Sequence, residues 1–106
     1  MLNQVIIAGV VKETPVIKET STGLHYANLI VEVKKEFRNT EGNYDVDTFS
    51  ILLWRSVAEH CTSICKEGNL VAIKGRLQSS LYNREDGSVF YNYEIIADKV
   101  FFLEQK

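Results

Sequence analysis

The feature that most constrains the fold of this chain is a single change of hydrophobic period near its middle. Over residues 4–54, and again over residues 70–103, apolar side chains alternate with polar ones or form short apolar runs bounded by turn residues, which is typical of strands. Between these two regions, residues 56–68 carry apolar side chains at helical spacing instead. The sequence therefore predicts a chain of strands interrupted by one helix of about three turns.

The predicted helix begins near Ser56 and ends before Gly68, a residue type that commonly follows a helix C-terminus. Ser56 and Glu59 have the spacing of a capping box, in which the serine hydroxyl accepts a hydrogen bond from the Glu59 amide and the Glu59 carboxylate reaches back. The apolar stripe that we expect to face the core consists of Val57, Cys61, Ile64 and Cys65.

Long strands are predicted around this helix at residues 4–11, 24–36, 48–55, 70–82 and 89–97, with a short closing segment at residues 100–103. Gly9 interrupts the first strand, and a glycine inside a strand often marks a bend or a close approach of two backbones. The third strand carries no charge on either face until Arg55, so we expect both of its faces to be largely covered. In the fourth strand, Leu77 and Leu81 share one face with Val71, opposite the polar face of the strand.

Three strands, one helix and two further strands, with a glycine-bent first strand, follow one another in the order of an OB-fold. That fold is a five-stranded, partly open barrel, here with its helix between strands 3 and 4, and it binds oligonucleotides or oligosaccharides on strands 2 and 3 and adjoining loops. A chain of 106 residues is long enough for one modest hydrophobic core but not for two. We therefore expect residues 1–106 to form a single OB-fold domain, all-β with one helix.

The residues that could carry chemistry form no catalytic or metal-binding pattern. Cys61 and Cys65 lie four residues apart on the predicted core-facing stripe, and a zinc site needs about four ligands. His60 points to another face of the helix and His25 lies on a distant strand, so neither histidine completes such a site. We expect both cysteines to be reduced and buried as small hydrophobic residues. We also expect the protein not to be an enzyme and to use no metal ion or cofactor.

Charge and hydropathy limit the partners. Twelve Lys and Arg against fourteen Asp and Glu give a formal net charge of −2, which counts against strong non-specific binding to polyanions. A basic stripe in a groove can nevertheless bind nucleic acid locally. No apolar run is long enough to span a bilayer, and the N-terminus has no basic region or cleavage site of a secretory signal. These features predict a cytoplasmic protein without a membrane partner.

Three clusters combine basic side chains with an aromatic ring. They are Lys34, Lys35 and Arg38 around Phe37 at a predicted hairpin tip, Trp54 followed by Arg55, and Lys74, Arg76 and Tyr82 on the polar face of strand 70–82. Aromatic rings stack on bases, each worth about 1–3 kcal/mol, while the cations follow the phosphates. The clusters therefore predict binding of single-stranded nucleic acid without sequence reading.

Each cluster also has a purely structural interpretation. Trp54 alone is compatible with a core residue, and the third cluster with a solvated strand face that carries an isolated tyrosine. Phe37 has the same parity as the buried-type residues Leu29 and Val33, so its ring either points outward or turns inward.

Many segments in register resemble the bacterial single-stranded DNA-binding protein (SSB) family over nearly the whole chain. They are Met1-Leu2-Asn3 with residues 5–9, Leu53-Trp54-Arg55 followed by Ala58-Glu59, Lys66-Glu67-Gly68-Asn69-Leu70-Val71, Gly75-Arg76-Leu77-Gln78, and Ala97-Asp98 through Phe102-Leu103-Glu104. The resemblance implies an OB-fold homotetramer that binds and protects single-stranded DNA in replication, recombination or repair, associated with the nucleoid in the cytoplasm. It places the stacking rings on Phe37, Trp54 and Tyr82, and basic contacts on Lys35, Arg55 and Arg76 among others.

The chain departs from the family pattern at several positions. Thr48 replaces a fourth stacking ring, Val10 replaces an arginine, and Ser80 replaces a basic residue, so we expect weaker DNA binding or a shorter footprint. Phe49 has the opposite parity to Thr48 and should face elsewhere, a subunit contact being one option. The family's flexible acidic tail would follow Lys106, where this chain stops. We therefore expect a short form without tail-mediated recruitment of partners, either a shortened chain or a short paralogue.

Two hypotheses for function follow. The first is an SSB-like homo-oligomer that coats and protects single-stranded DNA. The alternative is an OB-fold protein-interaction module of a replication-restart (primosome-type) assembly, which the three departures and the negative net charge motivate. The alternative predicts stable oligomers that bind DNA only weakly.

Overall fold

The computed structural model describes residues 1–103, so residues 104–106 of the predicted domain, including the last residue that carries the resemblance, lie outside the described part. The elements in chain order are β1 (Val5–Val11), β2 (Lys18–Glu19), β3 (His25–Arg38), β4 (Tyr44–Trp54), α1 (Arg55–Ile64), β5 (Leu70–Asn83) and β6 (Val89–Phe102). Every predicted long strand and the helix are confirmed. β4 begins earlier than predicted, and β6 joins two segments that the sequence divides.

The long strands form a closed ring. β1 pairs antiparallel with β5 and β3, β5 pairs antiparallel with β6, and β3 pairs antiparallel with β4. A short parallel pairing of β4 with β6 completes the ring, while β2 adds two residues to the edge of β3. Since α1 lies between the third and fourth long strands, the predicted OB-fold is confirmed as a ring of five strands with one helix.

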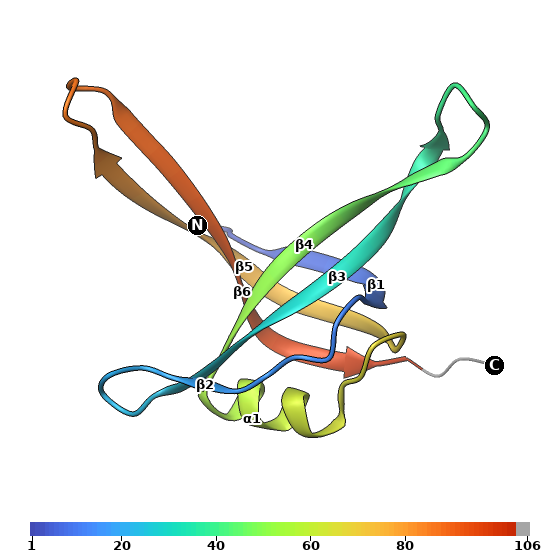
Figure 1. Cartoon of the computed structure of the whole chain (residues 1–106), viewed down its shortest axis with the longest axis horizontal. Coiled ribbons are helices and arrows are strands. Elements are labelled where there is room, and N and C mark those ends of the chain that lie inside the picture. The colour runs from blue at the N-terminus through green and yellow to red at the C-terminus, as the bar shows by residue number, and fades with distance from the viewer. Residues whose placement is uncertain (104–106) are drawn as a thin grey trace.

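The hydrophobic core fills the inside of this ring, and α1 closes one end of it (Figure 1). The largest fully buried side chains are Leu29, Ile51, Leu53, Ile73, Val11, Val31, Val71, Cys61 and Cys65. The prediction that both cysteines are buried free thiols, with no disulfide between them, is confirmed. Burial raises the pKa of Cys61 to about 12, so its thiol stays protonated at neutral pH. No helix within residues 1–103 is long and apolar enough to cross a membrane.

Two glycines let neighbouring strands approach closely. A Cβ atom at Gly9 would collide with the carbonyl oxygen of Glu32 on β3 and with the Val31 side chain. A Cβ atom at Gly75 would collide with the backbone of Ile96 on β6. The close approach predicted at Gly9 is therefore confirmed, and Gly75 allows the same tight packing on the other side of the ring.

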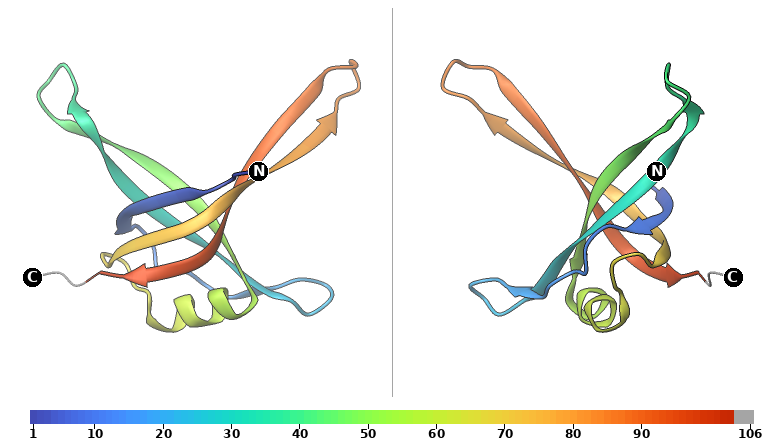
Figure 2. Two further views of the ribbon diagram at one scale, coloured as in Figure 1. Left: turned by 180° about the vertical axis from the view of Figure 1, so that it is seen from behind. Right: turned by 45° about the vertical axis from the view of Figure 1, so that its right-hand side comes forward.

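Two hairpins extend beyond the ring as arms (Figures 1 and 2). We call the outer part of β3 and β4 with residues 39–43 the first arm, and the outer part of β5 and β6 with residues 84–88 the second arm. Leu77 and Leu81 lie on the second arm and are exposed, although they share the face of the buried Val71. Apolar and polar side chains still alternate along this part of β5. Within residues 1–103, however, no second layer covers the apolar face of the arm.

The prediction for the helix N-terminus is wrong in detail. α1 begins at Arg55, and its N-cap residue Trp54 makes no side-chain capping hydrogen bond. The Glu59 carboxylate does not reach back to Ser56, because its Oε1 atom lies 2.8 Å from Nδ1 of His25 on β3. Glu59 therefore contacts His25 on β3 and does not form the predicted capping box.

The buried stripe of α1 also differs from the predicted one. Ala58 and Cys61 are buried within the helix, and Cys65 follows them just past its end. Ile64, predicted to face the core, is exposed. Ile64 therefore lies at the edge of the buried stripe and not at its centre.

Only one face of β4 is covered, so the prediction of two covered faces is wrong. Ile51 and Leu53 point into the ring and are buried, whereas Thr48 and Ser50 on the outer face are exposed. A ring has one filled interior, and the outer face of a strand is covered only where a neighbouring side chain reaches over it. Phe49 shares the inner parity and packs against the core.

We predict that Gly9→Ala lowers the free energy of unfolding by about 1–3 kcal/mol, because the added methyl group forces β1 and β3 apart. Urea denaturation measured by circular dichroism gives this value. Ser50→Ala is the matched control, since Ser50 is exposed on β4 and its change should stay within about 0.5 kcal/mol. Equal stability of the Gly9→Ala variant and the wild type would contradict the close approach.

Candidate nucleic-acid interface

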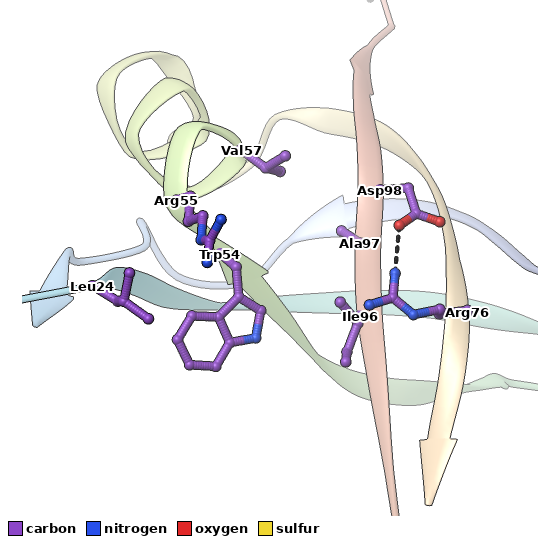
Figure 3. Close-up of a pocket in the computed structure, with 8 residues that line it drawn as sticks. All are labelled: Leu24, Trp54, Arg55, Val57, Arg76, Ile96, Ala97 and Asp98. Atoms are coloured by element: carbon purple, nitrogen blue, oxygen red, sulfur yellow. Dashed lines mark hydrogen bonds and ion pairs between the residues drawn. The ribbon is translucent and has the colours of Figure 1, made fainter. Parts of the chain in front are cut away.

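A pocket of about 410 Å³ lies where β4 ends and α1 begins, beside β5 and β6 (Figure 3). Its lining residues are Leu24, Trp54, Arg55, Val57, Arg76, Ile96, Ala97 and Asp98. The pocket thus brings together Trp54, Arg55 and Arg76 from the predicted binding residues. Figure 3 shows Trp54 and Arg55 near the start of α1, with Arg76 and Asp98 across from them on β5 and β6.

The Trp54 side chain lies on the outer face of the ring and is half-buried. Tyr26 is its direct partner across the β3–β4 pairing, with ring centroids 5.5 Å apart and planes tilted by 40°. The indole is therefore held by one aromatic neighbour and lines the pocket, which a core residue would not do. Tyr26 was missed from the sequence, because only the register between the two strands places it opposite Trp54.

Arg55 occupies an unusual backbone conformation at the rim of this pocket. Its φ angle is 55°, and among residues 1–103 every other residue with positive φ is a glycine. A non-glycine residue in the left-handed region costs about 1–3 kcal/mol. This turn ends β4 and begins α1, so the exposed guanidinium of Arg55 stands directly beside Trp54 in sequence and on the same pocket.

Arg76 is held by an acidic neighbour. Its Nη1 atom donates a hydrogen bond of 2.7 Å to Oδ1 of Asp98, and both side chains are about half-exposed. Lys74 lies two residues earlier on β5 and is exposed, but it does not line the pocket. Of the three predicted members of this cluster, only Arg76 therefore lines the pocket.

The first arm carries the cluster around Phe37. The Phe37 side chain is 82% exposed, which excludes the inward orientation. Lys34 Nζ and the Arg38 guanidinium carbon lie 5.6 Å and 5.3 Å from the centroid of the Tyr44 ring, within the range of cation–π contacts. Lys35 Nζ is 3.5 Å from Oδ1 of Asp47.

The second arm carries Tyr82, which is exposed near its tip. Its ring centroid lies 6.3 Å from that of Phe90, and the Arg84 guanidinium carbon lies 4.9 Å from the Phe90 centroid. Phe90 and Arg84 were missed from the sequence. The Asp86-Gly87 turn was the signal that could have found Phe90, because a hairpin around this turn places Phe90 opposite Tyr82.

Tyr44 on the first arm was missed for a related reason. It follows the turn at residues 39–43 and stands directly opposite Arg38 in the strand pairing. The turn at Gly42, with φ of 83°, sets this register and could have suggested the pair.

The predicted binding residues therefore occupy three places on the molecule: the pocket with Lys74 two residues from Arg76 on β5, the first arm and the second arm. The two arms diverge from the ring (Figures 1 and 2), and the molecule extends 49 × 40 × 28 Å. A ligand that contacts all these places must be long and flexible. A small planar anion would engage only the pocket.

Two of the positions at which the chain departs from the family pattern have an acidic neighbour. Thr48 and Val10 both stand opposite Glu32, on β4 and β1 respectively. Glu32 Oε1 lies 3.9 Å from Nζ of Lys12. This side of the ring thus has a carboxylate where a phosphate-binding surface would gain from a positive charge.

The chemistry that the pocket offers is stacking on an indole and pairing of two guanidinium groups with an anion, opposed by one carboxylate. Within residues 1–103, no group of three or more His, Cys, Asp or Glu side chains is arranged to hold a metal ion.

The chain is similar to known proteins along its whole length. Residues 2–103 match the model of the single-strand binding protein family. The chain is 35% identical over 106 residues to the single-stranded DNA-binding protein of Oceanobacillus iheyensis, of which it covers 66%. It is 35% identical over 106 residues to the single-stranded DNA-binding protein B of Bacillus subtilis, of which it covers 94%. It is 32% identical to the single-stranded DNA-binding protein 1 of Staphylococcus aureus, of which it covers 68%. The chain thus spans about two thirds of the first and third of these relatives.

We predict that Arg55→Gly raises the free energy of unfolding by about 1 kcal/mol, because glycine adopts the left-handed conformation without a Cβ penalty. Arg55→Ala is the matched control: it also removes the guanidinium but keeps the Cβ, so it should bring no gain. Urea denaturation of both variants gives the comparison. Equal stability of the glycine and alanine variants would show that the turn at Arg55 is not strained.

Proposed function

The chain belongs to the single-strand binding protein family, and we propose that it binds and protects single-stranded DNA, without reading its sequence, in replication, recombination or repair. The observation that carries this proposal is the pocket that Trp54, Arg55 and Arg76 line together. An indole and two guanidinium groups on one pocket match the base and phosphate of one nucleotide. The proposed function is binding, and it needs no catalytic step, metal ion or cofactor.

We propose that the strand runs from the pocket onto the arms. Trp54 stacks on one base, while Phe37 and Tyr82 each supply a further exposed ring. The basic side chains that follow the phosphates are then Lys34, Lys35, Arg38, Arg55, Lys74 and Arg76. Stacking tolerates any base because every base has a π face, which accounts for binding without sequence preference.

We further propose that residues 1–106 act as one OB-fold domain within a homotetramer in the cytoplasm, associated with the nucleoid. β1 pairs with β3 only at Val10 and Val11, so the opposite half of that strand edge is open to a second copy. Several large apolar side chains are exposed on β1 and the second arm, namely Ile6, Leu77, Leu81, Tyr91 and Tyr93. Apolar patches of this kind mark interaction surfaces.

The test of DNA binding uses the fluorescence of Trp54, the only tryptophan of the chain. Titration with oligo-dT should quench this fluorescence, and added salt should reverse the quenching as the cations release phosphate. Phe37→Ala and Tyr82→Ala should each weaken binding by about tenfold, within the range for loss of one stacking ring.

Two other results would change the proposal. Binding seen by fluorescence anisotropy of labelled DNA without Trp54 quenching would move the site away from the pocket. Absence of binding by both methods at low salt would favour the protein-interaction module instead.

The tetramer is tested by sedimentation equilibrium, in which we predict a mass about four times the 12.1 kDa of one chain. Ile6→Glu should shift the equilibrium toward smaller species, because it places a charge on the open half of β1. Val16→Glu is the matched control, since Val16 is 67% exposed and Ile6 71% exposed, but Val16 lies outside the strands. A monomer mass at all concentrations would contradict the proposed assembly.

A further inference from the structure

We propose that Asp98 competes with DNA phosphate for Arg76 and thereby limits the affinity of the pocket for single-stranded DNA. This inference rests on the proposed function, because it concerns the same pocket. In this inference, Asp98 helps to set the affinity for single-stranded DNA and the salt dependence of that affinity.

The first argument is the backbone geometry that brings Asp98 to the pocket. Between β5 and β6, Lys74 pairs with Lys99 and the next residue, Gly75, pairs with Ala97. Asp98 is therefore the extra, unpaired residue of a β-bulge on β6. Bulges re-aim side chains and are common beside binding sites.

Gly75 is the residue that makes this bulge possible. Its missing Cβ leaves room for the backbone of Ile96, which would otherwise collide with it. The close approach of Gly75 to β6 and the extra residue Asp98 are next to each other in the β5–β6 strand pairing. Together they place the Asp98 carboxylate beside the guanidinium of Arg76, as Figure 3 shows.

The second argument is the charge of the pocket lining. Arg55 and Arg76 are its cations, and Asp98 is its one acidic residue. A phosphate that approaches Arg76 meets a carboxylate already bonded to Nη1 at 2.7 Å. The two anions repel each other and use the same donor group, so binding of one weakens binding of the other.

The third argument is that this competition is partial. A guanidinium group has five N–H donors, and the structure records one hydrogen bond from Arg76 to Asp98. Both side chains are about half-exposed, and ion pairs at such positions are weak. Phosphate can therefore reach Arg76, but with lower affinity than it would have for an unpaired arginine.

The first arm repeats the arrangement at a second place. Lys35, another predicted phosphate contact, has its Nζ atom 3.5 Å from Oδ1 of Asp47 on the neighbouring strand. The longer distance makes this pair the weaker of the two. The pocket is therefore the better place for a test.

The test compares the affinity of the full chain and its Asp98→Asn variant for oligo-dT at a series of salt concentrations. Asparagine keeps the shape of the side chain and removes its charge. We expect affinity at low salt to rise about two- to fivefold, the range that weak exposed ion pairs correspond to. We also expect the slope of log K against log salt to steepen by about 0.7 for each pocket engaged, because one more cation becomes free to replace counterions.

Glu67→Gln is the matched control, because it changes the net charge equally but lies in the turn after α1. Glu67 lines a different pocket with Val10 and Lys12. Its affinity for oligo-dT should change less than that of Asp98→Asn. An equal gain in both variants would reduce the effect to net charge and overturn the proposal.

A double-mutant cycle with Arg76→Gln shows whether the effect passes through Arg76. In the Arg76→Gln background, Asp98→Asn should bring a smaller gain in affinity, because only the direct repulsion between Asp98 and the phosphate is left to remove. A gain of the same size in that background would overturn the proposal. A loss of affinity in Asp98→Asn alone would also overturn it, since Asp98 would then position Arg76 for DNA.

Folding and function are controlled separately. Circular dichroism and thermal denaturation verify that Asp98→Asn is folded, and Asp98→Ser replaces it if it is not. Asp98→Glu keeps the charge and should retain the lower affinity of the wild type. If the wild type and every variant fail to bind oligo-dT, the proposed function itself fails. Unchanged affinity in a folded Asp98→Asn variant of a binding wild type overturns the role of Asp98 alone.

Discussion

The short parallel pairing between β4 and β6 is the constraint on which the rest of the structure depends. It joins Ile51 to Ile95 and Leu52 to Ile96, and together with the short β1–β3 pairing it closes the ring. Because the two strands run in the same direction, both leave the pairing on the same side. Trp54 follows two residues after Leu52, and Asp98 follows two residues after Ile96. The closure of the core therefore also determines which side chains meet in the pocket.

The ring and the arms make different physical contributions. The ring has a filled interior and two places where glycine lets backbones touch, so the side chains of the pocket stand on a rigid base. The arms are two-stranded ribbons without a core, and their aromatic and basic side chains are exposed on both sides. A flexible ligand can start on the rigid pocket and extend along an arm, because both arms are continuous with strands of the ring (Figure 1).

Local patterns in the sequence were sufficient for the elements of the fold, whereas the binding residues stay a prediction. The alternation of apolar residues in strands and their spacing in a helix depend only on neighbours in the chain. These patterns predicted the strands, the helix, the close approach at Gly9 and the burial of Cys61. They did not predict which faces are covered, because cover depends on distant segments: Leu77 and Leu81 are exposed although they share the face of the buried Val71. The contact of Tyr26 with Trp54 depends on strand register, and the contact of Asp98 with Arg76 depends on a bulge. Neither feature has a signal within its own segment.

The charge distribution connects the acidic composition of the chain to its binding surface. Within residues 1–103, three lysine and arginine side chains have a carboxylate within 4 Å: Lys12 with Glu32, Lys35 with Asp47, and Arg76 with Asp98. Each such cation is already partly neutralised, so it adds less to the attraction of a phosphate than an unpaired cation does. The exposed rings are not affected by this neutralisation, since stacking does not depend on net charge. In a chain with a formal net charge of −2, the proposed binding of a single strand is therefore expected to rely more on Phe37, Trp54 and Tyr82 than on the number of basic residues nearby.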